Sequence, residues 1–229
     1  MNILVIDVGG THIKLLVTGA KNRLEFESGP EMTPKKMIAS IKKITASAGW
    51  KFDAVSMGYP GPVVHGHPMA EPHNLAPGWV GFPYREALGK PVKIINDAAM
   101  QALGSYKGRR MLFLGLGTGL GSALIVDGVV EPMELAHLPF KKGRTYEDYV
   151  GLRGLNRLGK KKWRKEVAEV AKLLRAATQA DYVVFGGGNA RLLKKLPPWA
   201  QLGDNNNAFR GGFRLWDPPK NHPRHTPVH

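Results

Sequence analysis

Two glycine-containing turns, each set between apolar runs, carry the residue types that bind phosphate groups. The first turn lies in residues 3–17 (ILVIDVGGTHIKLLV) and the second in residues 111–126 (MLFLGLGTGLGSALIV). Apolar and β-branched residues on both sides of a tight turn predict a β-hairpin, and glycine lets backbone N–H groups converge on an anion. The residues that can do this are Gly9, Gly10, Thr11, Gly117, Thr118 and Gly119. Either stretch alone fits an ordinary hairpin, but the repetition predicts two related halves that grip a polyphosphate chain.

Two aspartates lie beside predicted strand ends. Asp7 ends the first predicted strand next to the first turn, where a carboxylate and phosphates can share a divalent cation. Asp97 follows a predicted strand at residues 92–96 and precedes a predicted helix at residues 98–106. It therefore lies at the carboxyl edge of a sheet, where open α/β folds bind ligands; the alternative is a simple helix N-cap. Lys14 follows the first turn and either neutralises phosphate or is an ordinary surface residue.

The elements that must position these residues alternate between strands and helices. Predicted helices include one that Thr33 caps and Gly49 ends, and a long amphipathic helix at residues 160–178. A glycine run separates a predicted strand at residues 180–185 from a predicted helix at residues 190–194, which leaves N–H groups for an anion or room for a flat ring. That run is Gly186, Gly187 and Gly188.

The segment at residues 65–79 is predicted to be a loop. Trp79 either covers the apolar face of a sugar or anchors the loop to the core. Three histidines occur here, but without cysteine or a helical histidine spacing they do not predict a metal site. These histidines are His65, His67 and His73.

Together with the segments Asn96-Asp97-Ala98 and Glu134-Leu135-Ala136-His137, the two turns resemble the sugar kinases of the actin/hexokinase/Hsp70 superfamily. More narrowly, residues 2–216 resemble the ROK family (repressor, open reading frame, kinase). The resemblance implies an α/β, two-lobed actin-like ATPase (ribonuclease H-like) fold with a central cleft. It implies an N-terminal lobe of residues 1–107, a C-terminal lobe of residues 108–204, a helix at about 205–217 that returns to the first lobe, and a flexible tail at 218–229.

The resemblance also implies roles for individual residues. In this family the aspartate of the Asn-Asp-Ala segment takes a proton from the sugar hydroxyl, so Asp97 is the expected catalytic base. A Glu-x-Gly-His element binds sugar hydroxyls, although here Ala136 replaces the glycine, and an ordinary structural histidine is the alternative for His137. Asp7 is expected to orient Mg²⁺ through water. The sugar ligands implied are Asn74, Asn96, Asp97, Glu134, His137 and Glu147. The phosphate and nucleotide ligands implied are Asp7, Gly9, Gly10, Thr11, Lys14, Gly117, Thr118, Gly119, Gly186, Gly187 and Gly188.

One feature departs from the family pattern. Many ROK proteins carry a cysteine-rich zinc motif after the histidine, but this chain has no cysteine, so no zinc site of that type is expected. Residues 144–151 (RTYEDYVG) occupy its place, and Glu147 is taken from this segment. The short, zinc-less form resembles the polyphosphate glucokinase branch of the family.

Composition narrows the class of protein. The chain has 229 residues, 43% of them hydrophobic, which predicts a globular protein with a substantial core. Without cysteine or a long apolar run, we expect a cytoplasmic protein that does not enter a membrane. The formal net charge of +15 predicts attraction to polyanions, with a general solubility effect as the alternative. Basic clusters occur at residues 109–110, 141–142 and 160–165.

The prediction from the sequence is a hexose kinase that phosphorylates glucose at the 6-hydroxyl, with polyphosphate and/or ATP as donor and Mg²⁺ as cofactor. One alternative is a non-catalytic ROK-type sugar sensor that binds DNA, but such regulators carry a helix-turn-helix before the first hairpin, which begins here at residue 2. The other is a kinase for mannose or an N-acetylhexosamine. A sugar and a polyanionic donor are the expected partners; nucleic acid is not expected, and a homodimer is left open.

Overall fold

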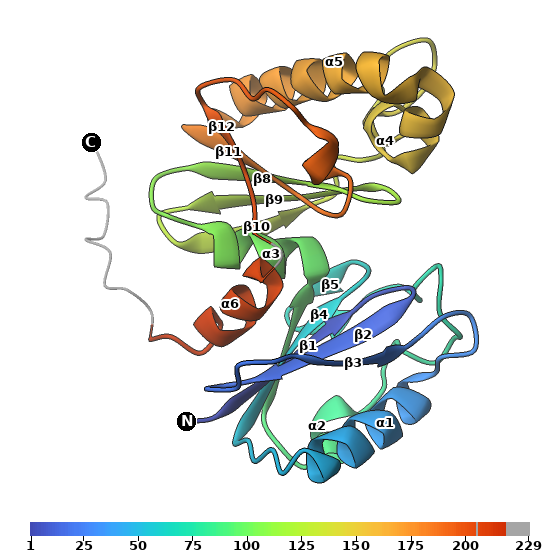
Figure 1. Cartoon of the computed structure of the whole chain (residues 1–229), viewed down its shortest axis with the longest axis vertical. Coiled ribbons are helices and arrows are strands. Elements are labelled where there is room, and N and C mark those ends of the chain that lie inside the picture. The colour runs from blue at the N-terminus through green and yellow to red at the C-terminus, as the bar shows by residue number, and fades with distance from the viewer. Residues whose placement is uncertain (205, 219–229) are drawn as a thin grey trace.

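The computed structural model describes residues 1–204 and 206–218, and it contains two five-stranded sheets with the same strand order (Figure 1). The first sheet has the order β3-β2-β1-β4-β7, and the second has the order β10-β9-β8-β11-β12. The first comprises β1 (Ile3–Val8), β2 (His12–Val17), β3 (Leu24–Glu27), β4 (Ala54–Tyr59) and β7 (Val92–Asn96). The second comprises β8 (Met111–Leu116), β9 (Leu120–Val126), β10 (Val129–Met133), β11 (Tyr182–Gly186) and β12 (Ala200–Leu202). The predicted duplication is confirmed.

The pairing within each sheet is also repeated. β1 runs antiparallel to β2 and parallel to β4, while β8 runs antiparallel to β9 and parallel to β11. A parallel pair needs a crossover connection, which α1 (Pro34–Ser47) supplies in the first half and α5 (Leu152–Thr178) in the second. A further small hairpin, β5 (Val63–Val64) and β6 (His67–Pro68), interrupts the loop predicted at residues 65–79.

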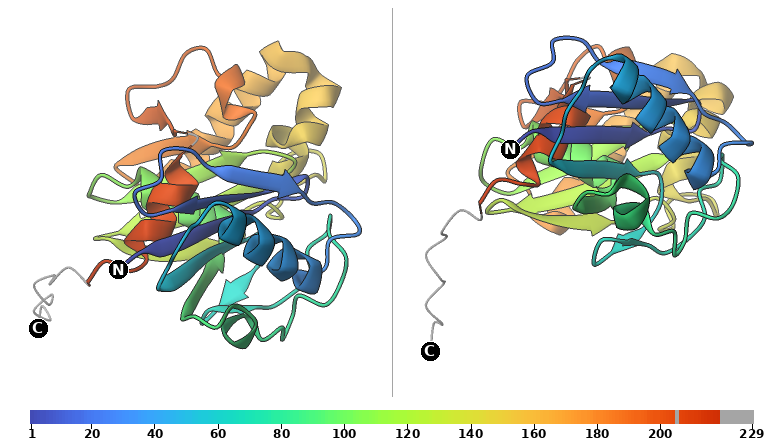
Figure 2. Two further views of the ribbon diagram at one scale, coloured as in Figure 1. Left: turned by 60° about the horizontal axis from the view of Figure 1, so that its bottom comes forward. Right: turned by 90° about the horizontal axis from the view of Figure 1, so that it is seen from below.

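Helices form layers outside and between the sheets. In Figure 1, α1 covers the outer face of the first sheet and α5 the outer face of the second, while α3 (Asp97–Ser105) and α6 (Asn207–Arg214) lie between them. α3 and α6 pack against each other, and Figure 2 gives two further views of the whole arrangement. Their close crossing depends on glycine, because a Cβ on Gly104 would collide with the Asn207 carbonyl and one on Gly211 with the Met100 carbonyl.

The remaining helices are short. They are α2 (Tyr84–Leu88), α4 (Tyr146–Val150) and the 3-10 turn η1 (Ala190–Leu192). The helix predicted at residues 190–194 is therefore wrong in length: Leu193 is already extended, and the prolines at 197 and 198 prevent a continuation. The long helix predicted from residue 160 starts earlier, at Leu152, but Gly159 breaks it with φ of 71°, so the predicted start matches its second segment.

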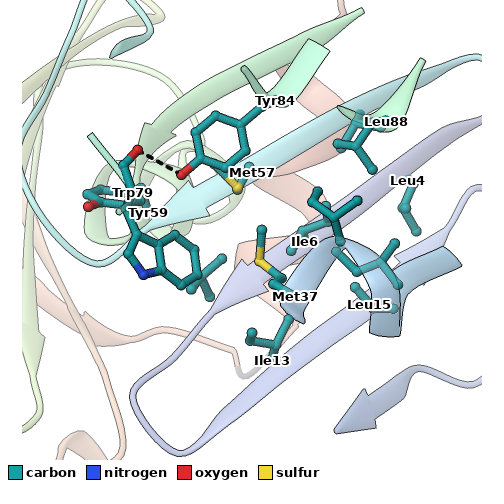
Figure 3. Packing of buried hydrophobic residues seen from close by; sticks show 14 of the residues in the cluster. Leu4, Ile6, Ile13, Leu15, Met37, Met57, Tyr59, Trp79, Tyr84 and Leu88 are labelled. Carbon is teal, nitrogen blue, oxygen red and sulfur yellow. Dashed lines mark hydrogen bonds between the residues drawn. The ribbon is translucent and has the colours of Figure 1, made fainter. Parts of the chain in front are cut away.

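The core of the first half explains the loop that carries Trp79. Met37 and Ile41 of α1 are fully buried against the first sheet, and Trp79 is 0% exposed in the same cluster (Figure 3). The Trp79 indole N–H donates to the Ala76 carbonyl at 2.7 Å, and the Tyr84 hydroxyl donates to the Trp79 carbonyl at 3.1 Å. Trp79 therefore anchors the loop, and the alternative that it covers a sugar is wrong.

The proposed division into lobes at residues 107 and 108 remains a prediction. α6 packs on β1 and β4 as well as on α3. The predicted flexible tail, apart from Pro218, lies outside the described residues. None of the helices within residues 1–204 and 206–218 combines the length and apolar character needed to span a bilayer.

Candidate active site

The two glycine turns occupy matching positions in the two sheets. Residues 9–11 join β1 to β2, and residues 117–119 join β8 to β9, as the sequence predicts. The Gly9 N–H donates to the His12 carbonyl, and the Gly117 N–H donates to the Gly119 carbonyl, both at 3.1 Å. A Cβ on Gly9 would lie 2.7 Å from the His12 carbonyl oxygen, so this turn requires glycine. The two turns thus lie at equivalent places, the carboxyl ends of β1 and β8, although the first spans four residues between its last paired strand residues and the second spans three.

The second turn is held by a hydrogen bond to the side chain of Glu147, in α4. Its Oε2 accepts the Leu120 N–H at 3.2 Å, and a Cβ on Gly119 would collide with the same carboxylate. The Glu147 N–H in turn donates to the Ala136 carbonyl at 3.0 Å. Glu147, predicted as a sugar ligand, therefore contacts the second glycine turn and connects it to the Glu134–His137 segment.

The third glycine run lies directly against the second turn. Gly187 has φ of 79°, and a Cβ there would lie 2.5 Å from the Leu116 carbonyl oxygen. The Asn189 side chain donates to the Gly117 carbonyl at 3.0 Å, and its backbone N–H donates to Leu116 at 2.9 Å. The structure thus brings residues 186–188 and 117–119 together. Asn189 was not predicted as a site residue, although its place after the glycine run is a signal for it.

The acid at the start of α3, Asp97, is affected by the charges of two other carboxylates, Asp7 and Glu134. Burial raises the pKa of Asp97 to about 7, and the negative charges of Asp7 and Glu134 raise it as well. The hydrogen bond from the Ala98 N–H has the opposite effect and lowers this pKa. Burial also raises the pKa of Asp7, opposed by the positive charges of Lys14 and Arg23. Lys14 is paired with Asp7 across the β1–β2 ladder, with Nζ 3.9 Å from Oδ2. An acid with a pKa near neutrality is suited to proton transfer.

Asn96, and not Asp97, caps α3. The Asn96 Oδ1 accepts the Ala99 N–H at 3.1 Å, and its Nδ2 donates to the Gly61 carbonyl at the same distance. Asp97 is the first helical residue, and its Oδ1 accepts the N–H of Ala98 at 2.7 Å. The N-cap alternative for Asp97 is therefore wrong. Asn96 already has a structural role, and its contact with a sugar stays a prediction.

The loop before Trp79 reaches the first turn. An added Cβ on Gly10 would lie 3.1 Å from the Asn74 Cβ, so this glycine allows the loop to pack on the turn. Glu71 fixes the loop by accepting the N–H groups of Gly78 and Trp79, each at 3.0 Å. Asn74, which belongs to this loop, therefore lies next to the first glycine turn.

Glu134 and His137 follow β10 in an exposed segment. The Leu135 N–H donates to the Ser122 hydroxyl at 3.2 Å, and Ala136 is buried. These contacts leave the flanking Glu134 and His137 side chains exposed. The negative charge of Glu134 raises the pKa of Asp97, so this segment lies within electrostatic reach of the acid.

Burial of Asp97 predicts a pH-dependent change in stability. The folded protein holds this proton up to a pKa of about 7, whereas the unfolded carboxyl loses it near 3.8. Because the folded state binds more protons in this window, the Asp97 contribution to the free energy of unfolding falls as pH rises from about 4 to 7. Between pH 5 and pH 8, the free energy of unfolding of wild type should therefore fall relative to that of Asp97→Asn by on the order of a few kcal/mol.

This prediction is measured by urea unfolding of both proteins at pH 5 and pH 8, without metal or substrate. Asp127→Asn, in the exposed β9–β10 turn, is the matched control and should follow wild type at both pH values. Equal pH dependence of wild type and Asp97→Asn would show that the Asp97 carboxyl ionises normally in the folded protein.

Comparisons with known proteins support one family. The model of the ROK family matches residues 3–131, which is more than half of the chain. A polyphosphate glucokinase of Mycobacterium tuberculosis is 29% identical over 221 residues, which cover 87% of this chain and 81% of that protein. An N-acetylmannosamine kinase of Escherichia coli O157:H7 is 28% identical over 142 residues, covering 56% of this chain and 48% of that protein.

A solved structure supports the same fold. The inorganic polyphosphate/ATP-glucomannokinase of Arthrobacter sp. strain KM has a TM-score of 0.76 and 22% sequence identity, covering 92% of this chain and 96% of that one. At this identity the likeness concerns the fold, and it agrees with the repeated strand order described above. The chain therefore belongs to the ROK family and has the two-lobed α/β fold of the actin-like sugar kinases.

Proposed function

We propose that the protein phosphorylates glucose at its 6-hydroxyl in the cytoplasm, using inorganic polyphosphate or ATP as the donor. The broader class, a phosphotransferase of the sugar-kinase type, is indicated by the named relatives. The observation that carries the proposal is Asp97, a partly buried acid with a pKa of about 7 at the start of α3, facing charges from both halves.

The reaction needs one proton acceptor and accurate positioning. As the sugar oxygen bonds to the terminal phosphorus, the bond from that phosphorus to the bridging oxygen breaks, and the hydroxyl proton passes to the Asp97 carboxylate. The donor leaves shorter by one phosphoryl group. Such transfers depend mainly on positioning and on neutralising charge, so turns that present backbone N–H groups can supply much of the catalysis.

The donor is proposed to lie between the glycine turns. Residues 9–11 would hold its phosphates from the first half, and residues 117–119 and 186–188 from the second. Lys14, beside Asp7, would neutralise part of the charge. The contact of residues 186–188 with the second turn makes them one surface, which also suits the ring of a nucleotide.

Mg²⁺ fits this arrangement as an ion that arrives with the donor. Within the described residues, no three side chains of His, Cys, Asp or Glu gather as a metal site. Mg²⁺ is commonly bound by one or two carboxylates, substrate phosphates and water. Asp7 would therefore orient it through water, and the bound ion would neutralise charge on the transferred group.

The sugar is proposed to bind between the loop at Asn74 and the segment after β10. Asn74, Asn96 and Asp97 would contact it from the first half. Glu134 and His137 would contact it from the second, with Glu147 behind them at the second turn. Glu147 can serve both as a support of the turn and as a sugar ligand, because a carboxylate has two oxygens and one of them accepts Leu120.

Glu134→Ala and His137→Ala are each expected to weaken glucose binding by about 1–3 kcal/mol, because a sugar hydroxyl would lose its partner. Calorimetric titration of glucose measures this directly. Glu131→Ala, in exposed β10, is the matched control and should bind glucose normally. Normal glucose affinity in both site variants would place the sugar elsewhere.

The experiment that tests the function is a matrix of acceptors and donors, with the phosphorylated sugar measured directly. Glucose, mannose and N-acetylmannosamine would each be combined with ATP and with polyphosphate. Mannose tests the alternative acceptor predicted above, and N-acetylmannosamine is included because a kinase named for that sugar is 28% identical over 142 residues. Sugar binding without product from any donor would instead favour the sugar-sensing alternative.

A further inference from the structure

We propose that Ser122 of β9 is a positioning residue that holds Glu134 in place for the sugar. The inference rests on the proposed function, in which Glu134 is a sugar ligand. Ser122 is 2% exposed, and its hydroxyl bonds to the backbone on both sides of Glu134. It donates to the Met133 carbonyl at 2.7 Å and accepts the Leu135 N–H at 3.2 Å. One buried side chain therefore fixes the residues that flank an exposed carboxylate.

The hydroxyl acts where the pairing of β9 with β10 ends. Ser122 and Met133 are the last paired residues of the two strands, so the ladder stops one residue before Glu134. By accepting the Leu135 N–H, Ser122 continues the attachment beyond the ladder. Leu135 and the buried Ala136 then pack into the core of the second half, while the side chain of Glu134 remains exposed.

The other end of the segment is held by a different element. The N–H groups of Glu147 and Tyr146, at the start of α4, donate to the carbonyls of Ala136 and Leu138 at 3.0 and 3.1 Å, respectively. These two carbonyls lie on either side of His137. The two proposed sugar ligands of this segment are thus fixed separately, one by β9 and the other by α4.

The opposite face of β9 meets the start of α3. Because side chains alternate along a strand, position 121 faces away from the Ser122 side chain. A Cβ on Gly121 would lie 2.8 Å from the Ala98 Cβ, and Ala98 directly follows Asp97. One strand therefore contacts the helix turn of the proposed base with one face and holds the sugar segment with the other. Such a strand can set the spacing between Asp97 and Glu134.

The test measures glucose binding by calorimetry, without a donor. In Ser122→Ala the Leu135 N–H loses its acceptor and Glu134 its fixed place, so glucose should bind about threefold to tenfold more weakly. Ser56→Ala is the matched control, because Ser56 in β4 is 0% exposed and also makes two hydrogen bonds. Its hydroxyl donates to the Gly212 carbonyl and accepts the Trp216 indole N–H. The control should bind glucose like wild type.

A double-mutant cycle separates positioning from a general structural effect. If Ser122 acts through Glu134, Ser122→Ala should weaken glucose binding in the wild-type background and have no further effect in Glu134→Ala. In His137→Ala it should keep its full effect, because α4 holds that residue. Equal losses in all three backgrounds would overturn the proposal, as would the same loss in Ser56→Ala or an unchanged affinity in Ser122→Ala.

Amide hydrogen exchange gives a readout that needs no sugar. In wild type the Leu135 amide should be protected although it lies outside the β9–β10 ladder, because the Ser122 hydroxyl accepts it. It should exchange faster in Ser122→Ala, whereas the amides of residues 146 and 147 should keep their wild-type rates. Rapid exchange of the Leu135 amide in wild type would show that Ser122 does not hold the segment, and this measurement depends on no variant.

The same measurements separate this proposal from the proposed function. If the cycle shows the expected dependence on Glu134 but wild type forms no sugar phosphate from any donor, the kinase assignment fails and the role of Ser122 stands. If wild type phosphorylates glucose and Ser122→Ala binds it normally, the function stands and this proposal fails. Thermal unfolding of each variant checks that the fold is intact.

Discussion

Asp97→Asn is expected to lower the turnover number by about 10²–10⁴-fold while leaving the fold intact. The amide keeps an oxygen that can accept the Ala98 N–H, now at 2.7 Å, so the start of α3 should be unchanged. It cannot accept the proton of the sugar hydroxyl. Because the neutral form of Asp97 is already favoured by burial and by the Asp7 charge, the substitution is electrostatically mild. The loss should therefore appear in kcat and much less in sugar affinity.

The measurement is kcat with a saturating donor, together with calorimetric binding of the sugar and urea unfolding. Asp127→Asn again serves as the control for loss of one carboxylate. A kcat within a few-fold of wild type would remove Asp97 as the base. A matched loss in sugar affinity would instead assign Asp97 a role in binding alone.

The parts of the fold that could be predicted are those set by local sequence pattern. Both hairpins, the cap of α1 by Thr33 and the strand before Asp97 follow from apolar runs, turn residues and capping residues close together in the chain. The duplication could also be predicted, because similar turns in both halves require similar strands around them. These features depend on contacts over a few residues.

The roles of Trp79, Asn96 and Glu147 depend on distant contacts. Trp79 packs against Tyr59 with ring centroids 6.1 Å apart, and no local pattern distinguishes such an anchor from an exposed platform. Asn96 bonds to Gly61, and Glu147 bonds to Leu120. The sequence indicates that these residues are polar or aromatic near a site. It does not specify which backbone group each one meets after folding.

The basic clusters illustrate the same limit for charge. Residues 141–142 and 160–165 are prominent in the sequence, but Lys141 is held by two glutamates and the α5 lysines lie on an outer face. A surface groove with three cations, Lys21, Arg23 and Arg210, is built instead from separate segments, the β2–β3 connection and α6. Packing of α6 on the first sheet brings them together, so spacing along the chain could not reveal them.

Gly187→Ala is expected to destabilise the protein by about 2–5 kcal/mol and to disrupt the donor site. Gly187 has φ of 79°, which costs an alanine about 1–2 kcal/mol. The added methyl would also lie 2.5 Å from the Leu116 carbonyl oxygen, and such overpacking commonly costs about 1–3 kcal/mol. Relief of this clash must move the glycine run away from Leu116, and with it Asn189, which holds the Gly117 carbonyl.

Gly188→Ala is the matched control, because a Cβ there has no neighbour within 4 Å among the described residues and its φ is not in the left-handed region. The two variants replace neighbouring glycines of the same run, but only Gly187→Ala should unfold at a lower urea concentration than wild type. Because the second turn shifts with the run, kcat/KM for either donor should fall at least about tenfold in Gly187→Ala, since small misplacements of reacting groups are costly. The same midpoint of unfolding for both variants would show that the run does not depend on its contact with Leu116. Normal donor kinetics in a destabilised Gly187→Ala would separate the run from the donor site and leave the two hairpin turns to hold the phosphates.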